Sequence, residues 1–174
     1  FTNRETGEII NIDESGNVIP LPVVPLDPND LTVGVAAFSW EVDLGNQTGM
    51  EFTIDVVVNG YYTGSDETVV TVSLPEDNSV SGGGYIINES SGGTFAGDPG
   101  LRTNFGFNIK TNKKGTNVQG NVNILIRQDG RLYQIKTNAT DSLVALRSDD
   151  PDVFLAEFVS KANLKDITDP LEPR

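Results

Sequence analysis

The acidic residues of this chain form clusters whose chemistry suits a hard cation. The densest cluster is Asp149, Asp150 and Asp152, which lie beside Pro151 in a turn-like stretch. Calcium takes about six to eight oxygen ligands, and carboxylates this close repel one another unless a cation lies between them. These three residues are our candidate metal ligands, with Ca²⁺ as the candidate ion. The alternative is that acidic turns only keep a β-protein soluble and discourage pairing at sheet edges.

The absence of His and Cys limits the catalytic mechanisms that are open to this chain. The 174 residues include no His and no Cys, which excludes a Ser-His-Asp triad, a thiol nucleophile and zinc sites with nitrogen or sulfur ligands. A glycosidase needs two carboxyls about 5 to 9 Å apart, one of them desolvated. Glu41 beside Trp40 and Glu51 beside Phe52 are the only candidates, and each is more simply the outward residue of an alternating strand. We therefore expect no enzyme activity.

Exposed aromatic side chains along a flat face would indicate a carbohydrate-binding module. The chain offers Trp40, Tyr61, Tyr62, Tyr85 and Tyr133, and aromatic residues make up only 7% of the sequence. Tyr61 and Tyr62, in a turn, form the best pair. The competing interpretation is that these rings cap the core.

The net charge of the chain limits the kinds of partner that it can bind. The chain has 12 Lys+Arg against 25 Asp+Glu, a net charge of −13. Nucleic acids and anionic membranes attract positive surfaces, and no apolar run approaches the roughly 18 residues of a spanning helix. We expect no nucleic-acid partner and no membrane insertion. The acidic, Cys-free, Asn/Gly/Thr-rich composition is typical of bacterial extracellular proteins, so an extracellular or cell-surface location is expected.

Hydrophobic alternation predicts β-structure from Leu31 onward. The Asp129-Gly130 pair fits a two-residue type I′ hairpin, because both positions need positive φ. Residues 153–164 follow an acidic cap and fit either a short helix or a strand. Strands are predicted at 31–42, 50–58, 68–74, 85–87, 101–111, 117–127 and 131–138. A polar patch at 76–84 precedes the strand at 85, and its glycines 82–84 permit a bulge or a close backbone crossing at the start of that strand.

One predicted strand, 117–127, has an apolar face and an amide-rich face. Amides on neighbouring strands can form a ladder or bind a ligand, and the simpler alternative is a solvated face. The polar face comprises Asn117, Gln119, Asn121, Asn123 and Arg127, and the apolar face comprises Val118, Val122, Ile124 and Ile126.

Residues 1–29 differ from the rest of the chain. Four prolines favour an extended backbone, which makes regular helix improbable. Three alternatives remain open for this arm: a linker within a larger protein, a strand docked on its own body, or a donor strand for a neighbour. Its apolar side chains are unsuited to a solvated linker, and the candidate assembly residues among them are Ile9, Ile10, Ile12, Val18, Ile19, Leu21, Val23 and Val24.

Four short motifs follow one another in the second half of the chain: Val80-Ser81-Gly82-Gly83-Gly84-Tyr85-Ile86, Gly97-Asp98-Pro99, Asn104-Phe105-Gly106-Phe107 and Lys113-Lys114-Gly115. Their order and spacing resemble a β-module, sometimes labelled post-COAP, found near the C-terminal ends of large secreted bacterial proteins. The resemblance covers residues 80–170 and implies a strand near Lys161, so we predict β-structure for 153–164. Such modules continue beyond a later Asp-Pro turn, whereas this chain stops at Arg174. We therefore expect either a shortened module or an unpaired sheet edge.

These patterns predict an all-β protein. We expect an antiparallel β-sandwich, jelly-roll or immunoglobulin-like, over residues 30–174, and an extended Pro-rich arm or donor strand over 1–29. The expected function is non-catalytic: an extracellular structural or assembly module, in its specific form a filament or surface-polymer subunit joined by donor-strand complementation. Its partners would be other copies or neighbouring surface domains. The alternative is a calcium-aided carbohydrate-binding or adhesin-type module of a larger surface protein, with glycans as partners.

Overall fold

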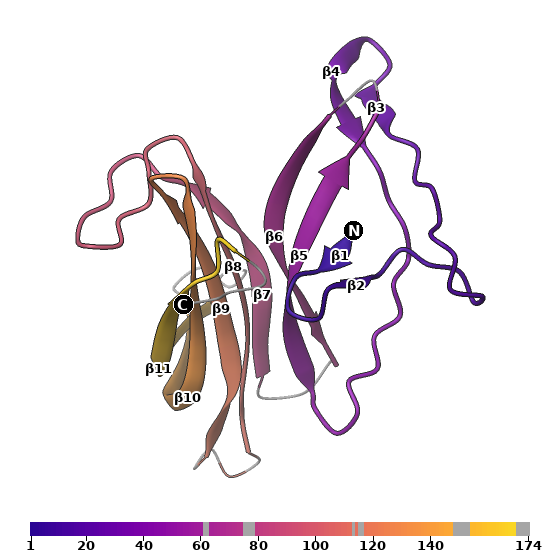
Figure 1. Cartoon of the computed structure of the whole chain (residues 1–174). Coiled ribbons are helices and arrows are strands. Elements are labelled where there is room, and N and C mark those ends of the chain that lie inside the picture. Colours follow the sequence, from indigo (N-terminus) through magenta and orange to yellow (C-terminus); the bar gives the residue numbers. More distant parts are fainter. Residues whose placement is uncertain (61–62, 75–78, 113, 115–116, 148–153, 170–174) are drawn as a thin grey trace.

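The chain folds into antiparallel β-sheets that pack face to face (Figure 1). The computed structural model describes residues 1–60, 63–74, 79–112, 114, 117–147 and 154–169. Within these ranges every regular element is a strand, which confirms the predicted all-β sandwich.

The larger sheet has five strands in the order β11-β10-β9-β8-β7, so each strand pairs with its sequence neighbour. Asp129 (φ 51°) and Gly130 (φ 72°) connect β9 to β10, which confirms the tight hairpin with two positive φ angles. The last strand confirms β-structure after residue 153 over the local helix signal. The strands are β7 (Ser79–Ile87), β8 (Arg102–Thr111), β9 (Val118–Gln128), β10 (Arg131–Arg147) and β11 (Phe154–Asp166).

Strand β7 begins inside the stretch 76–84 that the sequence marks as a polar patch. Gly82 lies opposite Phe107 and Gly83 opposite Gly106. A Cβ at Gly82 would lie 3.0 Å from the Phe107 ring. The strand thus begins earlier than predicted, and its glycines lie where a side chain would crowd the aromatic rings of β8, as expected for glycines at a strand start.

The smaller sheet has four strands in the order β2-β1-β5-β6, and a separate two-stranded hairpin extends beyond it at the top of Figure 1. The predicted strand 31–42 ends early, since the segment after Val35 does not pair. Instead Phe38 packs on Phe1 with ring centroids 5.0 Å apart, and Trp40 packs on Phe52 at 4.8 Å. The strands are β1 (Thr2–Asn3), β2 (Glu8–Ile9), β5 (Gly49–Val58) and β6 (Gly64–Ser73), and the hairpin is β3 (Val24–Asp27) with β4 (Asp30–Val35).

The layer between the two sheets is unusually polar. Asn123 on β9 is fully buried and donates from Nδ2 to Thr53 Oγ1 on β5, 3.0 Å away. Gln134 on β10 donates from Nε2 to both Thr53 Oγ1 and Asn123 Oδ1, each at 3.1 Å. At Asn123 and Arg127 the amide-rich face of β9 therefore faces the other sheet, whereas Asn117 and Gln119 are exposed, so the alternative of a solvated face holds only at the start of the strand. A small apolar cluster shares this layer: Val69, Leu125, Leu132 and Ile167.

Candidate functional site

The first eleven residues are docked on their own body. Thr2 and Asn3 in β1 pair with Asp55 and Ile54 in β5, and the Arg4 amide donates to the Thr53 carbonyl at 2.9 Å. The side chains of Asn3 and Asn11 are buried. The start of the arm therefore occupies an edge position in the smaller sheet.

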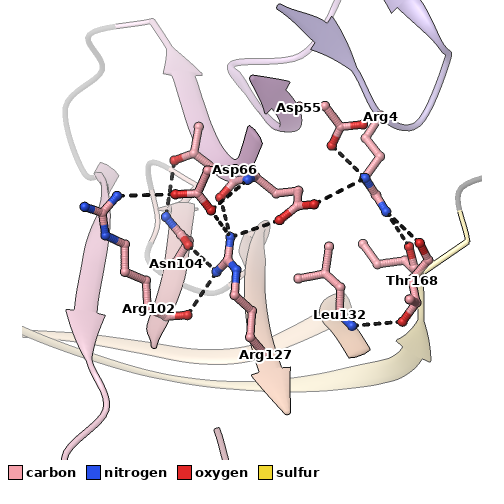
Figure 2. Close-up of polar contacts among 11 residues, drawn as sticks. Arg4, Asp55, Asp66, Arg102, Asn104, Arg127, Leu132 and Thr168 are labelled. Atoms are coloured by element: carbon pink, nitrogen blue, oxygen red, sulfur yellow. Dashed lines mark hydrogen bonds and ion pairs between the residues drawn. The ribbon is translucent and has the colours of Figure 1, made fainter. Parts of the chain in front are cut away.

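Arg4 fixes this segment to both sheets, as Figure 2 shows. Its Nη1 lies 2.8 Å from Asp55 Oδ1 on β5, and its Nη2 donates to the carbonyls of Ile167 (2.7 Å) and Thr168 (3.1 Å) after β11. The side chain is only 10% exposed. Because a guanidinium donates in several fixed directions, one side chain joins the arm, β5 and the far end of the larger sheet.

A second arginine joins the sheets on β9. Arg127 contacts Asp66 Oδ1 at 2.8 Å, the Glu67 carbonyl at 2.6 Å and Asn104 Oδ1 at 2.7 Å (Figure 2). Arg102 adds an exposed ion pair to Asp66 at 3.3 Å. The adjacent carboxylates Asp66 and Glu67 are therefore paired with arginines.

An apolar groove runs between the arm and the C-terminal end of β5. It encloses about 910 Å³. Five of the eight candidate assembly residues line it, namely Ile9, Val18, Ile19, Leu21 and Val23, whereas Ile10, Ile12 and Val24 lie elsewhere. The opposite wall is formed by Val35, Ala36 and Val56–Asn59.

The apolar surface continues onto the β3–β4 hairpin. Leu26 is 67% exposed and Leu31 is 61% exposed, and Val24, Val33 and Val35 are also exposed. Two-stranded hairpins are marginally stable alone in water. Groove and hairpin together make a continuous apolar region that the described part of the chain leaves open to solvent.

A second cavity, of about 210 Å³, lies between the sheets where the loop before β5 meets β8 and β9. No sequence pattern joins its parts, because the loop and the two strands are far apart in the chain. We call it the amide cleft, and its lining is Asn46, Gln47, Thr48, Gly49, Asn108, Lys110, Gln119, Gly120 and Asn121.

Glu51 is the carboxylate that the sequence placed wrongly. It is 5% exposed, not outward, and its Oε1 has no hydrogen-bond partner. Burial raises its pKa from the usual 4.5 to about 7, an effect that Lys136 partly opposes. Lys136 Nζ itself lies 2.6 Å from Glu5 Oε1 on the arm. Glu41, the other proposed carboxyl, is exposed.

The candidate metal ligands Asp149, Asp150 and Asp152 lie outside the described residues. Among the residues that are described, no group of three or more His, Cys, Asp or Glu side chains could hold a metal ion. Two other acidic turn residues accept local backbone bonds: Asp27 Oδ1 from the Asn29 amide and Asp43 Oδ1 from the Gly45 amide, both at 2.8 Å.

The aromatic candidates for sugar stacking are engaged with other side chains. Trp40 packs against Phe52, Tyr133 packs edge-on against Phe95 at 5.1 Å, and Tyr85 lies under the Arg102 guanidinium at 4.5 Å. Tyr61 and Tyr62 lie outside the described residues. The described rings therefore do not form the exposed flat row that the sequence raised as an alternative.

Comparisons with known proteins identify no relative of this chain. No family model, curated protein or solved structure matches the chain. Within the described residues, no helix is long and apolar enough to cross a membrane.

Proposed function

We propose that this chain is a non-catalytic structural module of the extracellular surface, which associates with further copies of itself through the apolar groove and the β3–β4 hairpin. The observation that carries the proposal is the continuous apolar surface over the arm, the end of β5 and this hairpin. Covering apolar area is the main favourable term in most protein association.

A second copy is the partner that this surface suits best. The hairpin with exposed Leu26 and Leu31 and the groove lined by Val18 and Leu21 are two ends of this continuous surface. A contact between the hairpin end of one copy and the groove end of another is heterologous, and repetition of such a contact yields a ring or a filament. Donor-strand exchange is the more specific form, in which residues 1–11 of one copy take the same place on another copy.

Substitution of Val18 tests the groove. Val18→Asp would bury a carboxylate without a partner in the contact, so we expect self-association to weaken at least about tenfold, equivalent to about 1.4 kcal/mol. Sedimentation velocity over a wide concentration range, with thermal melts to verify folding, measures this directly.

The matched control is Val159→Asp on β11. Val159 and Val18 are both 54% exposed, but Val159 does not line the groove. We expect the control to associate as the unmodified chain does. Equal weakening in both variants, or an unmodified chain that stays monomeric at every concentration, contradicts the proposal.

A further inference from the structure

The amide cleft has a lining of an unusual composition for this chain. Asn108 on β8 lies directly opposite Asn121 on β9, and the next pair on the same face is Lys110 with Gln119. Asn46 and Gln47 approach from the loop of the other sheet. The described residues of this lining thus include five amide side chains and no carboxylate.

Two glycines make room for Asn108 in the wall of the cleft. A Cβ at Gly49 would lie 1.4 Å from Asn108 Nδ2, and a Cβ at Gly120 would lie 2.0 Å from the Asn108 carbonyl oxygen. Gly120 also has a φ of +143°, which side-chain-bearing residues rarely adopt. Asn108 is therefore held between two backbone segments, and it is only 5% exposed.

The loop wall of the cleft is also fixed. The Gln47 amide donates to the Leu44 carbonyl at 2.9 Å, and the Thr48 carbonyl accepts from the Leu74 amide at 2.8 Å. Asp43 Oδ1 holds the turn through the Gly45 amide. The backbone of this wall is thus ordered before a ligand binds, which lowers the entropy cost of binding.

The chemistry of the lining selects a class of ligand. Each amide side chain offers two N–H donors and a carbonyl acceptor, and Thr48 adds a hydroxyl. Vicinal hydroxyl groups present the same mixture of donors and acceptors. The volume is below the roughly 300 to 1,000 Å³ of pockets for drug-sized ligands, so only a small ring fits.

We infer that the amide cleft binds the hydroxyl groups of a single sugar residue, such as the terminal residue of a glycan, and does so without calcium. This inference is independent of the self-assembly proposal, since the cleft and the apolar groove have no described lining residue in common. Because none of the described lining residues is aromatic, we expect hydrogen bonds to supply the affinity and the dissociation constant to be on the order of millimolar.

Nuclear magnetic resonance titration of the full chain tests the inference. The probes are glucose, galactose, mannose, N-acetylglucosamine and lactose, each up to about 20 mM, which is enough to half-saturate a millimolar site. We expect at least one of them to shift the side-chain NH₂ signals of Asn108, Gln119 and Asn121, equally with calcium and with EDTA. If no probe shifts these signals, or if EDTA abolishes the shifts, the inference is overturned.

Substitutions on the β9 side of the amide cleft distinguish a loss of sugar binding from a loss of folding. Gln119→Leu with Asn121→Leu removes two amides, and we expect at least tenfold weaker binding with an unchanged melt. The matched control is Asn163→Leu, an exposed amide on β11 outside the cleft, which should bind as the unmodified chain does. If the double variant melts lower, Gln119→Leu alone is used, since Gln119 is exposed, and it should still weaken binding. Unchanged binding in a folded cleft variant overturns the inference.

Discussion

Glu51 is a carboxyl group whose ionisation is opposed by burial in the folded chain. Its carboxyl lies in the polar layer between the sheets, with Lys136 as the nearby cation and Glu5 as a repelling anion. The pKa is raised on folding, from 4.5 to about 7. The contribution of Glu51 to stability is therefore fully present below pH 4.5 and is lost as pH rises through about 7.

This linkage predicts the behaviour of Glu51→Gln. An upward shift from 4.5 to about 7 corresponds to about 3 kcal/mol at pH 8. Since glutamine does not ionise, we expect the variant to unfold with a free energy up to about 3 kcal/mol higher at pH 8 and nearly unchanged at pH 4. Urea denaturation at both pH values measures the difference. Glu41→Gln, at an exposed position, is the control, and an equal gain in both variants contradicts the assigned cause.

At the scale of elements, the N-terminal arm is both part of a sheet and next to the surface proposed for assembly. A Cys-free chain permits a direct test with Thr2→Cys and Asp55→Cys, which are Cα partners across β1 and β5. In dilute solution we expect an intrachain disulfide. Oxidation of the assembled protein should instead link successive copies, if donor strands are exchanged, and non-reducing electrophoresis distinguishes the two.

The Thr2→Cys single variant controls for chance oxidation. If the assembled double variant gives only intrachain links, the donor-strand form is rejected, whereas contact through the groove remains testable with Val18→Asp.

Several elements were predictable because local chemistry decides them. The Asp129-Gly130 turn needs two positive φ angles, and the alternation over 50–58 marks a strand whatever surrounds it. It was not predictable which face of each strand would be buried against the other sheet. Alternation shows that Glu51 and Thr53 point away from Phe52, but it does not show which face is buried. In the structure both faces of β5 are covered, because Glu51 and Thr53 are buried and Phe52 packs on Trp40, which lies in a segment without strand pairing.

The amide cleft was not predictable for a related reason. Asn108 and Asn121 are partners on adjacent strands of one sheet, but Gly49 and the loop before it reach them only through the packing of two sheets, which no spacing in the sequence records. The arm, in contrast, was identifiable, because its prolines and its many apolar residues are visible in the sequence alone.

At the scale of the whole molecule, charge opposes self-association. Each copy has a net charge of −13, so two copies repel when their apolar surfaces approach. The screening length falls from about 10 Å at 0.1 M salt to about 3 Å at 1 M. We therefore expect association to tighten as NaCl is raised from about 0.05 to 0.5 M, as measured by sedimentation equilibrium. Association that weakens with salt would show that opposite charges hold the contact.

The Arg4 contact also has a consequence for the time course of folding. Its guanidinium bonds the carbonyls of Ile167 and Thr168, which are 163 and 164 residues away in the chain. Contacts of such high sequence separation form late and slow the overall reaction. During synthesis the arm emerges before the strands that it contacts, and although β1 can pair with β5 early, Arg4 lacks its carbonyl partners after β11 until the last strand arrives. In that interval a neighbouring chain offers an equivalent place, so crowded nascent chains would exchange arms more readily than chains refolded in dilute solution.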